Sequence, residues 1–188
     1  MILIIAILYL YSSIPFSLLI GKLYGKDIRK NGSGNVGASN LGRTCGKRAF
    51  LLAMFLDGTK GGFAVLLGYL FNMHPLILFP IALLGHGFSL FIGFKGGKGV
   101  ATSFGFVLAY TPLMSIMAIM IFLLILKITK YVSLSSVGAI LFYSILAFFF
   151  ISFYYGLFCF ICFLIILFLH LSNMKKIIKG KENKITWM

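Results

Sequence analysis

The stretch Val-Ala-Thr-Ser-Phe-Gly-Phe-Val-Leu-Ala-Tyr-Thr-Pro-Leu-Met-Ser-Ile-Met-Ala-Ile-Met-Ile-Phe-Leu-Leu-Ile-Leu, residues 100–126, decides how often this chain crosses a membrane. As a single helix it would be about 40 Å long at ~1.5 Å per residue, whereas the hydrocarbon core of a bilayer is about 30 Å thick. Pro112, which follows Tyr110 and Thr111, lies near the middle and disfavours continuation of a helix. We therefore predict two short spans that meet at an external turn.

The composition around this stretch excludes an ordinary soluble domain. Of 188 residues, 61% are hydrophobic, and only 17 Lys or Arg and 3 Asp or Glu carry charge. The mean hydropathy is +1.07, which is typical of a polytopic membrane protein. In such a protein the net charge of +14 indicates cytoplasmic loops and anionic lipid headgroups rather than nucleic acid.

The remaining apolar segments predict five further spans. The first lacks a basic leader and a small-residue cleavage site, so we expect a retained helix rather than a signal peptide. The five are Met1–Leu23, Ala49–Phe71, Leu76–Phe94, Ser133–Ser152 and Phe153–Leu171.

The basic residues support seven spans with the N-terminus outside. Fifteen of the 17 then lie in the cytoplasmic segments 24–48, 95–99, 127–132 and 172–188, and the exceptions are Lys22 and Lys60. If residues 100–126 formed one helix, segment 127–132 and the basic tail would lie on opposite sides of the membrane, which would break the positive-inside bias. We predict a single domain, residues 1–188: an all-α polytopic membrane protein of seven transmembrane helices, some short or broken, with a cytoplasmic C-terminus.

Two polar, glycine-rich clusters on the cytoplasmic side are typical of anion binding. Residues 32–43, Gly-Ser-Gly-Asn-Val-Gly-Ala-Ser-Asn-Leu-Gly-Arg, combine small residues that expose backbone N–H groups with one arginine. Residues 95–99, Lys-Gly-Gly-Lys-Gly, open a predicted helix, where freed N–H groups converge with a lysine. The spacing is not that of a Walker P-loop. The plainer alternatives are a flexible loop for the first cluster and a basic turn that anchors lipid headgroups for the second.

Three further groups of polar residues accompany these clusters. Asp57 and Lys60 share a helix face within a span, which favours a structural ion pair over catalysis. Ser133 to Ser136 begin a predicted helix, where a serine cap is the plain explanation. His170 and Asn173, near the end of the last span, lie one helical turn apart.

Several chemistries are disfavoured. With Asp27, Asp57 and Glu182 as the only acids, the sequence indicates neither paired carboxylates nor a carboxylate metal cage, and we expect no metal and no cofactor. Cys159 and Cys162 lie in an apolar run, which disfavours a stabilised thiolate.

Four motifs together resemble one known family. They are Gly-Ser-Gly-Asn-x-Gly-Ala-x-Asn-x-x-Arg at 32–43, Gly-His…Phe-Lys-Gly-Gly-Lys-Gly-Val-Ala-Thr at 85–102, Tyr-Val-Ser-Leu-x-Ser at 131–136 and His-x-x-Asn…Gly-x-Glu at 170–182. The chain resembles, over its whole length, the bacterial membrane glycerol-3-phosphate acyltransferases that use acyl-phosphate as donor. The resemblance implies seven helices with an outside N-terminus, and transfer of an acyl group to the 1-hydroxyl of glycerol-3-phosphate, giving lysophosphatidic acid for phospholipid synthesis.

The resemblance also implies roles for individual residues. Glycerol-3-phosphate would be held by Ser33, Arg43, Lys98, Ser136, His170 and Asn173. The backbone around Gly96, Gly97 and Gly99 would hold the phosphate of the donor, Asn35 and Asn40 would shape the first loop, and His86 is a further candidate contact. Ser89 stands where the family usually has proline, and Lys176 where it usually has arginine, so a bidentate phosphate contact from the tail is lost.

The mechanism leaves one choice open. Acyl-phosphate is already activated, so the protein chiefly holds two anions together and orients the hydroxyl. The proton goes either to His170, with Ser33 and Asn173 beside it as catalytic candidates, or to an oxygen of the donor phosphate, which we favour.

We expect a multi-pass protein of the cell membrane, with its site facing the cytoplasm and surrounded by membrane lipids. An enzyme that makes acyl-phosphate is an expected partner. A membrane transporter of an organic phosphate is the alternative, but the predicted external turns carry no charge to line a second opening. A scaffold would leave the polar clusters unexplained.

Overall fold

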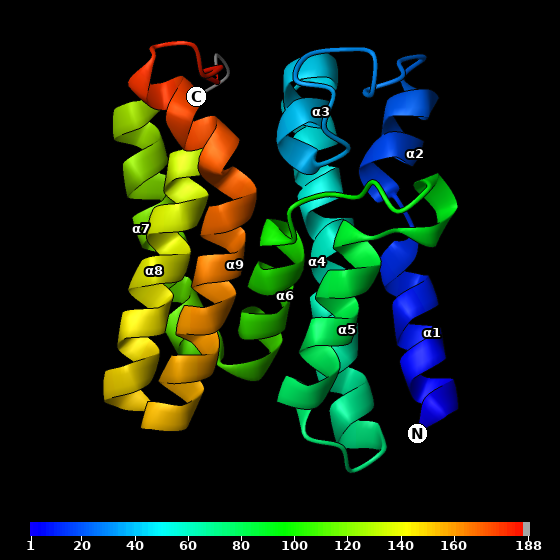
Figure 1. Ribbon diagram of the computed structural model, residues 1–188, viewed down its shortest axis with the longest axis vertical. Helices are drawn as coiled ribbons and strands as arrows, with labels where there is room; N and C mark the ends of the chain where they lie inside the picture. The colour runs from blue at the N-terminus through cyan, green and yellow to red at the C-terminus, as the bar shows by residue number, and fades with distance from the viewer. Residues whose placement is uncertain (186–188) are drawn as a thin grey trace. The chain divides into compact units, whose positions relative to one another are not determined.

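The computed structural model describes residues 1–185, which form helices and, within that range, no strand (Figure 1). The chain forms two compact units. Unit 1 comprises Met1–Thr111, and unit 2 begins at Pro112. The boundary falls inside the stretch 100–126, where one helix ends at Tyr110 and the next begins at Pro112. The predicted break at Pro112 is therefore confirmed.

Unit 1 contains two features that the hydropathy pattern did not predict. Its elements are α1 (Ile2–Ser13), α2 (Phe16–Leu23), α3 (Ala38–Cys45), α4 (Lys47–Leu70), α5 (Pro75–Gly87), the 3₁₀ helix η1 (Leu90–Ile92) and α6 (Val100–Tyr110). The first predicted span is broken at Pro15 between α1 and α2. The segment 24–48, predicted as a loop, contains α3, whose Gly42 packs closely against Phe50 of α4.

The helices of unit 1 differ in their capacity to cross a bilayer. At 11 residues α6 is about 16 Å long, roughly half of an apolar core. Six segments of the described chain are long and apolar enough to cross; they are Ile2–Leu23, Lys47–Leu70, Pro75–Ile92, Pro112–Thr129, Val132–Phe150 and Phe153–Ile178. A seventh crossing by α6, and the outside N-terminus, stay predictions.

The short helix α6 is held by close contact of its backbone with that of α4. A Cβ atom at Gly61 would overlap the carbonyl of Thr102, and one at Gly105 would overlap the carbonyl of Gly58. In addition, the hydroxyl of Thr102 donates to the backbone oxygen of Asp57 at 3.1 Å. Small residues that allow such contact are a common means of packing helices in membranes. Figure 1 shows α6 beginning part-way along α4, so the turn before it also lies there.

Unit 2 is a bundle of three consecutive helices, α7 (Pro112–Thr129), α8 (Val132–Phe150) and α9 (Phe153–Ile178). In unit 2, α9 continues for seven residues beyond Leu171, the predicted end of the last span. Hydropathy marks where a helix leaves apolar surroundings, whereas Lys175 and Lys176 form helix well and suit its carboxyl end. The following segment returns to the turn between α7 and α8, because the amide of Ile185 donates to the carbonyl of Lys130 at 3.0 Å.

The contact between α4 and α6 predicts a difference between two adjacent glycines. Gly61→Ala would drive a methyl group into the Thr102 carbonyl and should cost about 1–3 kcal/mol or more of unfolding free energy. Gly62→Ala is the matched control, because its Cβ would meet only the Gly105 oxygen at 3.9 Å and should change stability by about 1 kcal/mol or less. Thermal unfolding in detergent measures both. Equal melting temperatures for the two variants would contradict the contact.

Candidate functional site

The loop between α2 and α3 is organised by the side chain of Asn40. Its Oδ1 accepts from the amide of Ser33 at 2.8 Å. Its Nδ2 lies 2.8, 3.1 and 2.9 Å from the carbonyl oxygens of Ile28, Asn31 and Asn35. Asn40 itself is buried. One amide in the first turn of α3 therefore closes the loop and fixes the backbone at Ser33, as expected of a residue that shapes it.

Other contacts stabilise the two ends of this loop. Oδ1 of Asn35 accepts from the amide of Gly37 at 2.9 Å, just before α3. The ammonium of Lys26 donates to the carbonyl of Thr44 at 2.6 Å, where a cation suits the carboxyl end of α3. At the exposed edge Asp27 pairs with Arg29 at 2.7 Å, and the hydrogen bonds from Arg29 lower the pKa of Asp27 to about 2. The loop therefore keeps this pair throughout the neutral range of pH.

The glycine turn, residues 93–99, is fastened to the end of α5. The amide of Gly96 donates to the oxygen of Gly87 at 2.8 Å, and that of Gly97 donates to the oxygen of His86 at 3.1 Å. This finding changes the role predicted for those two amides, because they already have acceptors. The N–H groups at the amino end of α6, which follows Gly99, have no partner within the helix and are the better anion donors.

A buried ionic cluster lies behind the glycine turn. Nζ of Lys60 is 2.7 Å from Oδ1 of Asp57, which confirms the ion pair predicted from their spacing. The same Nζ is 3.3 Å from Nδ1 of His86. The hydroxyl of Ser17 donates to the other oxygen of Asp57 at 3.2 Å. The side chains of Lys60 and Asp57 are only 2% and 3% exposed, so their charges balance each other inside the unit.

A small cavity connects this cluster with both glycine-rich segments of unit 1. Its volume is about 10 Å³, which suits roughly one water molecule. Its walls come from the α1–α2 break, the first loop, the cluster and the glycine turn; they include Ser13, Pro15, Phe16, Val36, Asp57, Lys60, His86, Ser89, Gly96 and Gly97. The first loop and the glycine turn, 60 residues apart in the sequence at Val36 and Gly96, thus border one small cavity.

In unit 2, polar side chains gather where α8 begins and α9 ends. Oε1 of Glu182 accepts from the hydroxyl of Ser133 at 3.3 Å and from the amide of Asn173 at 2.8 Å. Glu182 is buried and thereby joins the tail to both helices. Sequence reasoning gave Glu182 no role, although an isolated acid in a basic tail was a usable signal. Ser136 bonds back to the carbonyl of Val132 at 2.8 Å within α8.

The hydrogen bond of His170 fixes which ring nitrogen is an acceptor. Nδ1 lies 2.8 Å from the carbonyl of Ile166 in the preceding turn of α9. A carbonyl oxygen only accepts, so Nδ1 carries the proton, and the neutral ring keeps its lone pair on Nε2. Nε2 therefore suits a substrate hydroxyl, either to orient it or to receive its proton.

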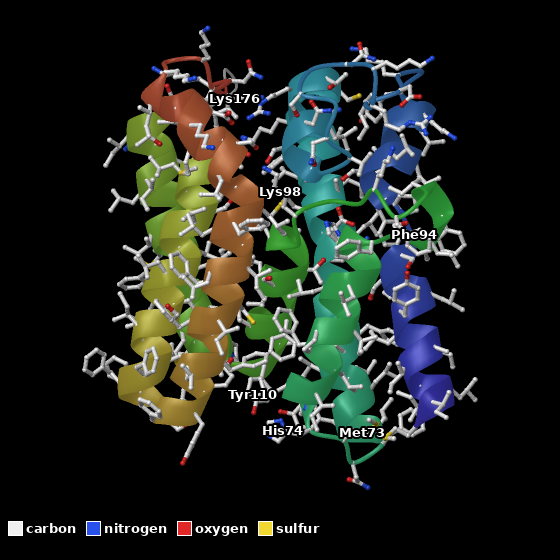
Figure 2. The ribbon with its side chains drawn as sticks, in the orientation of Figure 1. Met73, His74, Phe94, Lys98, Tyr110 and Lys176 are labelled. Carbon is white, nitrogen blue, oxygen red and sulfur yellow. The ribbon has the colours of Figure 1, made fainter. Side chains whose placement is uncertain are left out.

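The predicted site residues fall into two sets. Ser33, Asn35, Asn40, Arg43, His86 and Gly96 to Gly99 belong to unit 1, and Ser136, His170 and Asn173 belong to unit 2. Figure 2 shows Lys98 at the glycine turn, whereas His74 lies near Tyr110 at the opposite end of unit 1, with ring centres 6.4 Å apart. Within the described residues no group of three or more His, Cys, Asp or Glu side chains could hold a metal ion.

Comparison with known proteins places these features in a family. A family model described as glycerol-3-phosphate acyltransferase matches residues 2–180. The chain is 43% identical over 186 residues to the glycerol-3-phosphate acyltransferase of Listeria welshimeri, covering 96% of this chain and 94% of the relative. It is 41% identical over 189 residues to that of Bacillus subtilis, covering 99% and 98%.

The chain belongs to the glycerol-3-phosphate acyltransferase family.

Solved structures of this family agree with the fold. A crystal structure of PlsY (YgiH), an integral membrane glycerol 3-phosphate acyltransferase in its glycerol 3-phosphate form, is 33% identical with a TM-score of 0.89 and covers 98% of this chain and 95% of its own. The lysophosphatidic acid form has a TM-score of 0.87 at the same identity and coverage. This family member is accordingly a membrane protein, and large exposed apolar side chains such as Phe55 and Phe149 suit a lipid environment.

The two departures from the usual family pattern lie in different surroundings. Ser89 has a φ of −64°, the value that proline would impose, and its hydroxyl donates to the carbonyl of Ser13. The serine therefore keeps the backbone shape and adds a bond to α1. Lys176 lies exposed in the last turn of α9 (Figure 2).

The hydrogen bonds of Asn40 predict that its amide is needed for the shape of the first loop. Asn40→Asp keeps the acceptor for Ser33 but turns a carboxylate toward three carbonyl oxygens, so unfolding free energy should fall by about 2 kcal/mol or more. KM for glycerol-3-phosphate should also rise. Asn31→Ala, which loses one exposed bond to Asp27, is the control and should change little. Thermal unfolding and steady-state kinetics check both, and matching values for the two variants would refute the role of Asn40.

Proposed function

We propose that this protein transfers an acyl group from acyl-phosphate to the 1-hydroxyl of sn-glycerol-3-phosphate. The products are lysophosphatidic acid and inorganic phosphate. One observation carries the proposal: two glycine-rich segments, the first loop held by Asn40 and the glycine turn before α6, border the same small cavity in a member of this family. Such segments suit two phosphorylated molecules.

The chemistry of the donor explains why the site is cationic rather than acidic. The hydroxyl oxygen forms a bond to the acyl carbon, the bond between that carbon and the phosphate oxygen breaks, and phosphate leaves. No strong base is required to activate a mixed anhydride. What the protein supplies is charge to offset repulsion between two anions, and orientation of the hydroxyl. The net charge of +14 and the scarcity of acids support a protein that offsets anionic repulsion rather than one that supplies a strong base.

Individual residues hold the two substrates and orient the hydroxyl. The amino end of α6 holds the phosphate of the donor. Ser33, Arg43, Lys98, Ser136 and Asn173 contact glycerol-3-phosphate, as the family resemblance implies. Nε2 of His170 accepts a hydrogen bond from the 1-hydroxyl, because Nδ1 is engaged with Ile166. The proton then passes to an oxygen of the departing phosphate, which balances the reaction.

The location of the reaction follows from its substrates. Glycerol-3-phosphate is a soluble metabolite, whereas an acyl chain partitions into lipid, so the reaction belongs at a membrane surface. We propose the cell membrane, with the basic loops and the site facing the cytoplasm. An enzyme that produces acyl-phosphate would act as the preceding partner.

Replacing Lys98 tests the function itself. Lys98→Ala should lower the rate of lysophosphatidic acid formation by about 100-fold, because one cation that stabilises developing phosphate charge is lost. Lys22→Ala, the same change of charge at an exposed position of α2, should stay within about twofold of the unaltered protein. Purified protein in detergent is incubated with palmitoyl-phosphate and labelled glycerol-3-phosphate. Failure of the unaltered protein to make labelled product above the Lys98→Ala background would refute the acyltransferase proposal, and counterflow of glycerol-3-phosphate in vesicles would then test transport.

Replacing His170 tests where the proton goes. If His170 only orients the hydroxyl, His170→Gln should lower kcat by about tenfold, less than the 10²–10⁴-fold that a general base contributes. Its pH profile should otherwise match that of the unaltered protein. His74→Gln, at the far end of unit 1, is the control. A loss of about 10³-fold in kcat, with KM and melting temperature unchanged, would assign the proton to His170 instead.

A further inference from the structure

The contact between Lys60 and His86 determines the protonation of the imidazole. An ammonium group has three donors and no acceptor. Its approach to within 3.3 Å of Nδ1 is therefore a hydrogen bond only if Nδ1 holds a lone pair. In a neutral ring the proton must then lie on Nε2. The same ammonium is anchored by Asp57 at 2.7 Å, which fixes its position.

One other ionised group lies close to Nδ1. Oδ1 of Asp57 is 3.6 Å from Nδ1, longer than an ordinary hydrogen bond, and the ammonium of Lys60 lies against the same oxygen. In α1, Tyr9 donates to the carbonyl of Phe88, and Tyr11 pairs with Thr59. The remaining basic residues on segments packed against α5 are exposed or partly exposed. They are Lys47, Arg48, Lys95 and Lys98.

The opposite edge of the ring faces the glycine turn. A Cβ atom at Gly97 would overlap Nε2, so the nitrogen occupies the space that any other residue would fill. The amide of Gly97 also donates to the carbonyl of His86, which holds the turn against the ring. His86 and Gly97 both line the small cavity.

We infer that Asp57 and Lys60 are positioning residues that hold His86 as a neutral ring with its Nε2–H directed at the glycine turn. His86 then adds a hydrogen-bond donor to the phosphate site without adding a charge, and it is excluded as a base. The link to catalysis rests on the proposed function. The protonation state does not, and it is measured separately.

Nitrogen NMR of the histidine rings tests the protonation state directly. The chain has three histidines, so protein labelled with ¹⁵N-histidine gives three pairs of ring signals, and His86→Gln identifies one pair. We expect His86 to show protonated Nε2 and unprotonated Nδ1 at neutral pH. Protonated Nδ1 at neutral pH, in a neutral or charged ring, would overturn the inference.

Variants of the cluster test its cause. Lys60→Met removes the donor and leaves the Asp57 carboxylate beside Nδ1, so Nδ1 should gain a proton. Because an unpaired buried carboxylate threatens folding, the charge-neutral pair Asp57→Asn with Lys60→Met is the second variant. In it the preference for Nε2–H should weaken to a mixture of both neutral forms. Thr59 lies beside Lys60 on α4, and Thr59→Val loses the hydrogen bond to Tyr11 of α1. This control should leave the His86 signals unchanged. If His86 in the double variant still shows only the form protonated at Nε2, Lys60 does not determine the protonation of the ring.

Kinetics then tests the positioning role. The double variant should raise KM for acyl-phosphate about tenfold, the usual effect of one lost hydrogen bond to a charged group, with a smaller change in kcat. Thr59→Val should alter neither constant. If the protonation of His86 changes while KM for acyl-phosphate does not, the role of His86 in substrate binding would be overturned. A protein that makes no lysophosphatidic acid at all would refute the proposed function, while the NMR result would still decide the protonation of His86.

Discussion

The position of the candidate site in unit 1 depends on the backbone contact between α4 and α6. Without side chains at Gly58, Gly61 and Gly105, the two helices approach until carbonyl groups touch Cα atoms. This contact holds an 11-residue helix part-way along a 24-residue one. The amino end of α6, with its N–H groups, is thereby fixed within the unit instead of at its end. A longer α6 would cover the space in which the glycine turn, the cavity and the ionic cluster lie.

The few acids of the chain are used for architecture, which explains how so cationic a protein folds. Asp27 holds Arg29 at the edge of the first loop, Asp57 holds Lys60 inside unit 1, and Glu182 joins Ser133 to Asn173 in unit 2. Each carboxylate is thus committed to a neighbouring donor. The remaining positive charge is not balanced by acids of the chain. It is available to anionic lipids and to phosphorylated substrates, and it leaves little scope for chemistry by paired carboxylates.

Features that depend on length, periodicity or close sequence spacing could be predicted from the sequence. The break at Pro112 followed from a stretch too long for one span, and the ion pair between Asp57 and Lys60 followed from their separation by three residues. Features set by contacts between distant segments could not. The polar helix α3 packs closely against Phe50, and the amides of Gly96 and Gly97 are taken by carbonyls of α5. The positions of the two glycine-rich clusters could therefore be read from the sequence, whereas the carbonyl partners of the Gly96 and Gly97 amides could not.

The two histidines of the motifs show why residue type alone does not assign a role. Nδ1 of His170 faces a carbonyl and must donate, which leaves Nε2 as an acceptor. Nδ1 of His86 faces an ammonium and must accept, which leaves Nε2 as a donor. The first arrangement suits a hydroxyl that has to lose its proton, and the second suits a phosphate oxygen that gains negative charge. In a neutral imidazole only one nitrogen carries a proton, so the hydrogen-bond partner of Nδ1 determines what the other nitrogen offers to a substrate.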